Sequence, residues 1–178
     1  MGHVTTVEQA LAVMEACEDN AQAKGLDCDE LAQALRIIAA HQYETRPGIS
    51  MKGVAGAPDW KGYETGIWKL SEKVRALLKK RLDVRGKQPL LDVVAELAQT
   101  KRYGKGRQNL VLLLGEYGKE VYGDVLGRLL SDDEVYGHAL KALQRARIGG
   151  FADRAREIAA RERTGWIRTA ARKYGSSE

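Results

Sequence analysis

The C-terminal part of the chain repeats one pattern, in which apolar residues at helical spacing are followed by a very short connection. The spacing predicts helices at about residues 106–117, 119–130, 133–147, 150–162 and 164–174. Because the connections are only a few residues long, consecutive helices must turn back and lie antiparallel. This pattern favours a stack of helix pairs.

Composition favours helices throughout the 178-residue chain. Ala and Leu lead the apolar residues, and there are only one Phe and three Pro. Ala, Leu, Arg, Lys and Glu lose little freedom on entering a helix, whereas a β protein needs more Val, Ile, Thr and aromatic residues. We therefore expect an all-α protein.

The N-terminal part is organised differently. Helices are predicted at about 5–23 and 27–43, as an acidic hairpin. The stretch 44–63 holds two prolines and four glycines, which predicts a loop, and two further helices follow at 64–82 and 89–101. The predicted organisation is a hairpin at 1–43, a loop at 44–63 and a basic helical array at 64–178, within one continuous domain.

Two local details support the first helices. Thr5 and Glu8 have the spacing of a capping box, and Val7, Leu11 and Met14 recur on one face of the first helix. Pro89 suits the first turn of the helix that it opens.

The tetrapeptide Glu-Val-Tyr-Gly occurs at 120–123 and again at 134–137, a spacing of 14 residues that is too short for a two-helix unit. A longer spacing aligns more residues. Leu110, Leu113 and Val121 lie 30 positions before Leu140, Leu143 and Phe151, and Leu140, Leu143 and Arg147 lie 27 positions before Ile167, Ala170 and Tyr174. Helix–turn–helix units at about 27–30 residues are typical of an α-solenoid.

From about Arg107 to Gly175 the sequence resembles the short-repeat branch of the HEAT-repeat family. The segments RQNLVLLLGEYG, KEVYGDVLGRLLSDD, EVYGHALKALQRA and WIRTAARKYG carry the resemblance, although the usual Val-Arg pair is missing at the start of helix 133–147. The resemblance implies a right-handed α-solenoid of antiparallel helix pairs, with the N-terminal hairpin as its cap.

The glycines fit such an array. Gly104, Gly118 and Gly175 each follow a Tyr where a helix should stop, and Gly adopts the left-handed conformation that ends a helix. Four more glycines fall inside predicted helices, where a missing side chain lets neighbouring helices approach closely; these are Gly115, Gly123, Gly127 and Gly137.

Charge divides the chain. Residues 1–64 hold 5 Lys and Arg against 10 Asp and Glu, whereas residues 65–178 hold 24 against 14. Lys141 and Arg145 lie one turn apart, and Arg168 and Arg172 occupy the equivalent positions 27 residues later. With Arg154 and Arg161 they are the candidate contacts for a nucleic acid or an acidic protein surface, unless they are simply a solvated face.

Two tryptophans are further candidate contact residues. Trp68 falls off the apolar stripe of its helix, and Trp60 lies in the 44–63 loop. An off-core Trp can contact a partner, but we favour the alternative that the long loop covers Trp68.

Catalytic motifs are absent from the sequence. The nearest phosphate-loop lookalike, YGKGR at 103–107, lacks the strand-to-helix context of such loops and is interpreted as a basic turn between helices. No His or Cys pair has metal-ligand spacing, so we expect neither a metal nor another cofactor. No apolar run is long enough to cross a membrane and no signal peptide is recognisable, which predicts a cytoplasmic protein.

The favoured function is that of a non-enzymatic helical-repeat binding module or adaptor that holds a protein partner on its extended surface. The alternative is a nucleic-acid-binding protein that uses the basic C-terminal helices. A third, lower-ranked hypothesis comes from the DNA glycosylases built of HEAT-like helices, for which Trp60, Trp68, Trp166 and Asp59 are possible parts of a cleft.

Overall fold

The structure is a computed structural model that describes residues 4–16, 27–45, 50, 59–80, 87–163 and 165–176. Every regular element in these residues is a helix, apart from one isolated antiparallel bridge between Ser50 and Lys61. The all-α prediction is confirmed. The chain divides into two compact units, Met1–Leu110 and Val111–Glu178, here called unit 1 and unit 2. The division lies inside a helix, and the predicted domain boundaries near residues 43 and 63 stay a prediction.

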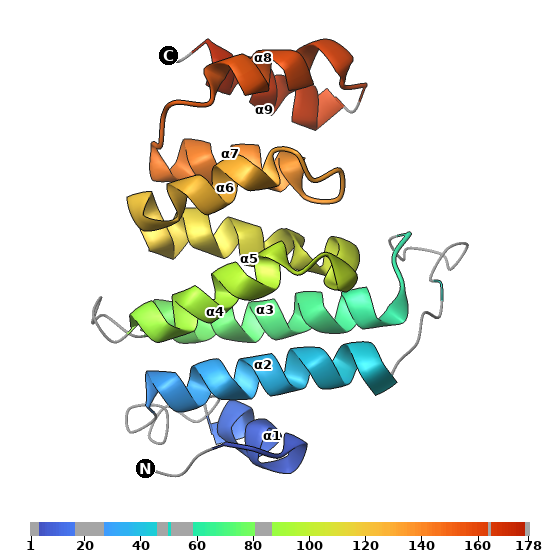
Figure 1. Ribbon diagram of the computed structural model, residues 1–178, viewed down its shortest axis with the longest axis vertical. Helices are drawn as coiled ribbons and strands as arrows, with labels where there is room; N and C mark the ends of the chain where they lie inside the picture. The colour runs from blue at the N-terminus through green and yellow to red at the C-terminus, as the bar shows by residue number, and fades with distance from the viewer. Residues whose placement is uncertain are drawn as a thin grey trace. The chain divides into compact units, whose positions relative to one another are not determined.

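Unit 1 is built around α2 (Cys28–Thr45), which packs against α1 (Val7–Ala16), α3 (Gly62–Lys80) and α4 (Gln88–Gln99) (Figure 1). A 3₁₀ segment, η2 (Lys101–Arg107), follows α4 and packs against α3 and α4. The fully buried centre of this unit includes the large aliphatic side chains Leu31, Leu35, Ile67, Leu78 and Leu90.

The start of α1 differs from the prediction by one residue. Thr6 and Gln9 form the capping box, because the Gln9 N–H donates to Thr6 Oγ1 at 3.2 Å and the Thr6 N–H donates to Gln9 Oε1 at 3.2 Å. The predicted pair Thr5 and Glu8 was wrong. The inward face is shifted as well, since Ala10 and Met14 are buried whereas Leu11 is 46% exposed.

The start of α4 agrees with the prediction, because Pro89 occupies its first turn. The predicted end of the first helix, at residues 17–23, lies outside the described residues, and so does most of the 44–63 loop. Whether that loop covers Trp68 therefore stays a prediction. Trp68 itself is 38% exposed.

Unit 2 contains α6 (Gly123–Leu129), α7 (Tyr136–Ala146), α8 (Ala152–Arg161) and α9 (Gly165–Gly175). Before them lie the π-helical turn η3 (Leu114–Gly118) and the 3₁₀ turn η4 (Lys119–Tyr122). Helix α7 is central, because it packs against η3, α6 and α9, while α8 packs on α9 (Figure 1). The boundary between the units falls in α5 (Gln108–Leu113).

The predicted helices 106–117 and 119–130 are each broken into shorter elements. Between the two, where a connection was expected, Lys119 has a φ of 50° and a ψ of −141°, which are incompatible with a helix. The expected left-handed glycine at Gly118 was wrong, because its φ is −88° and the positive φ falls on Lys119 instead. Gly104 does have a positive φ, of 54°, as predicted. The same expectation for Gly175 was wrong, because Gly175 is the last residue of α9 and has no positive φ.

Close helix contacts occur at the glycines of unit 2. A Cβ added at Gly115 would lie 2.5 Å from the Cα of Ala142, so η3 meets the backbone of α7 there. A Cβ at Gly137 would lie 2.8 Å from the ring of Trp166. The interpretation of these glycines as sites of close approach is confirmed. One aligned position fits the repeat poorly, because Val121, aligned with Phe151, is 69% exposed.

Candidate binding surface on helices α7 and α9

Trp166, in the first turn of α9, lies against α7 and is 40% exposed. The Nζ atom of Lys141, on α7, lies 4.0 Å from the centre of the indole ring. Such a cation–π contact contributes about 0.5–1 kcal/mol at an exposed site. We call Lys141, Arg145 and Trp166, together with the partly buried His138 beneath the indole, the α7–α9 surface.

The sequence places these side chains together through helical spacing and one glycine. His138, Lys141 and Arg145 are three and four positions apart and therefore share one face of α7. Gly137 leaves the space in which the Trp166 ring lies. His138 and Trp166 then meet edge to face, with ring centres 5.3 Å apart.

His138 is the titratable group that this packing perturbs most clearly. Burial of the imidazole, and then the positive charge of Lys141, lower the pKa of His138 from 6.5 to about 4. The imidazole is therefore neutral at physiological pH, and the positive charge of the surface comes from Lys141 and Arg145. Arg145 is partly neutralised by Glu116 of η3, with an N–O distance of 3.1 Å.

The other predicted basic residues have different environments. Arg168 and Arg172 are exposed and share one face of α9, while Trp166 and Lys173 share another. Arg154 of α8 pairs with Glu157 at 2.6 Å. The guanidinium of Arg161 lies 5.8 Å from the ring centre of Tyr136. The structure thus places Lys141 and Arg145 on the face of α7 next to Trp166, and it holds Arg154 in an ion pair within its own helix.

The predicted contact residues Trp60 and Trp68 belong to unit 1, where Trp60 is half-buried and Trp68 lies on the exposed side of α3. Sequence reasoning placed Trp166 only in the glycosylase hypothesis and did not link it to Lys141. Gly137 is the sequence feature that could have indicated this contact. A Gly inside a helix lowers its stability, so its presence on α7 indicates that another element packs closely there.

A second aromatic cluster, in unit 1, was not predicted. Tyr43 meets Tyr63 and Tyr103 edge to face, with ring centres 5.3 and 6.1 Å apart. The guanidinium of Arg102 lies 5.4 Å from the centre of Tyr43 and donates to the Tyr103 hydroxyl at 3.1 Å. This hydrogen bond raises the pKa of Arg102 above its usual value. Arg102 thus already occupies the faces of the tyrosine rings on which a cationic ligand would have to bind.

The YGKGR segment forms the η2 turn between α4 and α5, as interpreted from the sequence. The carboxylate of Glu64, only 5% exposed, accepts hydrogen bonds from the backbone N–H groups of Lys61 at 2.5 Å and Lys105 at 2.7 Å. A side chain of the protein itself therefore takes the position that an anion would need in this turn. The turn is a structural element rather than a phosphate site.

Among the residues that the structure describes, no group of three or more His, Cys, Asp or Glu side chains is placed to hold a metal ion. No helix in the same ranges is long and apolar enough to cross a membrane. Comparisons with protein-family models, with curated proteins and with solved structures gave no match.

Proposed function

We propose that this protein is a helical-repeat binding module, a right-handed α-solenoid of antiparallel helix pairs that holds a protein partner on its exposed surface. The observation that carries the proposal is the α7–α9 surface, where the exposed Trp166 of α9 lies against Lys141 of the packed helix α7. Tryptophan and arginine are enriched at the centres of protein interfaces.

The spacing of contacts in unit 2 supports the solenoid. Tyr174 Oη donates to the Ile148 carbonyl at 2.6 Å, and Gln144 Nε2 donates to the Ala170 carbonyl at 2.8 Å. Both bonds, and the one from Tyr136 to Glu162, join residues 26 positions apart. In a solenoid each unit contacts its neighbour, so contacts recur at about the repeat length, which the sequence places at 27–30 residues.

Nucleic-acid binding is the second candidate, favoured by the exposed Arg168 and Arg172 on one face of α9 and by the exposed Trp166 on another face of the same helix. Bases stack on exposed aromatic faces, and basic side chains contact phosphates. We rank it second for two reasons. Lys141 lies over the Trp166 ring and would have to leave before a base could stack on that face, and Arg145 is paired with Glu116.

A pull-down from native lysate, with and without nuclease, tests the proposal. The proposal expects capture of a protein that survives nuclease and is lost with Trp166→Ala and with Lys141→Ala. Lys119→Ala is the matched control, because it removes an exposed lysine from η4. Trp68→Ala tests the predicted contact in unit 1.

Nuclease-sensitive capture would favour the second candidate. Binding of DNA or RNA should then weaken steeply with salt and be lost when Lys141, Arg145, Arg168 and Arg172 are changed to Ala. The glycosylase hypothesis would require release of a base from alkylated DNA.

A further inference from the structure

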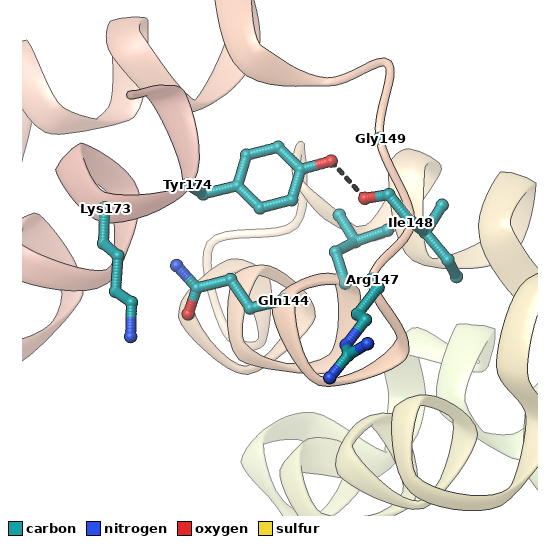
Figure 2. Close-up of a pocket in the computed structure, with 7 residues that line it drawn as sticks. Gln144, Arg147, Ile148, Gly149, Lys173 and Tyr174 are labelled. Atoms are coloured by element: carbon teal, nitrogen blue, oxygen red, sulfur yellow. Dashed lines mark hydrogen bonds between the residues drawn. The ribbon is translucent and has the colours of Figure 1, made fainter. Parts of the chain in front are cut away.

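A pocket of about 350 Å³ lies where the C-terminal ends of α7 and α9 meet (Figure 2). Its apolar wall is formed by Leu143, Ile148 and the ring of Tyr174, and its polar rim by Gln144, Arg147 and Lys173. The size lies within the roughly 300–1,000 Å³ range of ligand pockets. We call it the Arg147 pocket.

The pocket is held open by hydrogen bonds between the two helix ends. The bond from Tyr174 Oη to the Ile148 carbonyl fixes the tyrosine ring against the segment that leaves α7 (Figure 2). The bond from Gln144 Nε2 to the Ala170 carbonyl ties α7 to α9 beside it. A ligand therefore meets a preformed wall and loses little binding free energy to ordering it.

The rim of the pocket is basic. Arg147, at the end of α7, and Lys173, in the last turn of α9, both line it. Arg156 of α8 adds a third cationic side chain nearby, since it donates to the Gly175 carbonyl at the end of α9, at 2.8 Å. Among the described residues, those that line the pocket include no acidic side chain. An acidic group that enters the pocket would therefore approach basic side chains from both helix ends.

The backbone at Arg147 is the second observation. Its φ of 57° and ψ of 39° are left-handed, at the position after a helix where Gly is preferred. A residue with a Cβ atom is strained in this conformation, whereas Gly is not. This strain is not offset by any ion pair of Arg147 that the structure describes, and such strain is often retained where the side chain has a function.

We propose that the Arg147 pocket binds an acidic segment of the protein partner, with one apolar side chain against Leu143, Ile148 and Tyr174 and a neighbouring carboxylate between Arg147 and Lys173. This inference rests on the proposed function and specifies the partner's chemistry. The apolar wall favours a peptide over a nucleic acid, since a phosphate backbone would use the two cations and leave the wall exposed to water.

Fluorescence polarisation with labelled peptides tests the inference on the full chain. The main probe contains single leucines separated by pairs of glutamates. A second peptide has Ser for each Leu, a third has Lys for each Glu, and oligothymidylate represents a nucleic acid. The first probe should bind at least about fivefold more tightly than each of the others.

Three variants locate the binding. Arg147→Gly and Lys173→Ala should each lower the affinity for the peptide of leucines and glutamates by about fivefold. Arg147→Gly is expected to fold, because it places Gly in a left-handed position. Arg163→Gly makes the same chemical change at an exposed residue that does not line the pocket and should leave the affinity unchanged.

Equal binding of the Ser peptide, or an equal loss with Arg163→Gly, would overturn the inference, because charge alone would then explain binding. Tighter binding of oligothymidylate, lost in the same pocket variants, would overturn it in favour of a phosphate site. The pull-down separates the two proposals. If a nuclease-resistant protein partner still binds the variants Arg147→Gly and Lys173→Ala, the proposed function is kept and the proposed role of the pocket is rejected.

Discussion

The carboxylate of Glu64, at the start of α3, accepts a hydrogen bond from the backbone N–H of Lys105, which lies 41 positions later in the η2 turn. The same carboxylate accepts the Lys61 N–H. A Cβ added at Gly106 would lie 2.5 Å from the Glu64 carbonyl oxygen, so a larger residue could not approach in the same way. One buried acid thus joins the start of α3 to a glycine-rich turn.

Replacing this acid should destabilise unit 1. Glu64→Gln keeps the size of the side chain but turns charged acceptors into a neutral amide, half of which is a donor facing backbone donors. We expect the free energy of unfolding to fall by about 1–3 kcal/mol in urea denaturation followed by circular dichroism. Glu15→Gln, an exposed change on α1, is the control. Equal stability of both variants would show that the two hydrogen bonds contribute little.

The tripeptide Tyr-Gly-Lys occurs at 103–105 and at 117–119, and the unusual backbone falls on a different residue in each copy. Gly104 has φ 54° and ψ −142°, and Lys119 has φ 50° and ψ −141°. Only Gly adopts this conformation without strain. Lys119→Gly should therefore stabilise unit 2 by about 1 kcal/mol. Lys119→Ala keeps the Cβ and should gain nothing, so an equal gain in thermal unfolding would attribute the effect to the lysine side chain instead.

The contact between Gly115 and Ala142 should tolerate no side chain. Gly115→Ala places a Cβ 2.5 Å from the Cα of Ala142, which forces η3 away from α7. We expect a loss of about 1–3 kcal/mol of stability. Gly165→Ala is the matched control, because a Cβ there meets nothing within 4 Å. If thermal unfolding places both variants within experimental error of the parent, the close approach at Gly115 is not rigid.

Stability should depend on pH through His138. Its pKa is about 4 in the folded state against 6.5 normally, so between these values the unfolded chain binds a proton that the folded chain does not. Stability therefore falls as the pH falls from 6.5 to 4, by at most about 3 kcal/mol from this residue. Unfolding measured across this range should show a flatter profile for His138→Gln.

Lys141→Ala tests whether the positive charge of Lys141 contributes to the low pKa of His138. Without the nearby positive charge, the pKa of His138 should rise in an NMR titration, while burial keeps it below 6.5. A pKa that does not move would mean that Lys141 is too well screened to act on the ring.

The helices could be predicted because each apolar stripe extends over several turns. Pro89 and the short connections fixed where several of them begin or end. A helix stop near residue 118 was expected, but the sequence does not indicate that Lys119 rather than Gly118 takes the positive φ. Helix boundaries elsewhere differ by one to three residues from those expected.

Only part of the α7–α9 surface could be predicted from the sequence. Spacing alone placed Lys141 and Arg145 on one face of a helix. The position of Trp166 over Lys141 depends on how α9 crosses α7, which Gly137 permits but does not specify. Glu64 and Lys105 were hidden for a related reason, since residues 41 positions apart meet only through tertiary packing.

The contact between Lys141 and Trp166 also makes this surface observable by light. The chain has three tryptophans, and the other two, Trp60 and Trp68, belong to unit 1. Changing those two to Phe would leave a single indole with an ammonium group 4.0 Å from its ring centre. Because a nearby charge alters the emission of an excited indole, anything that displaces Lys141 would change the colour or intensity of fluorescence, without any attached dye.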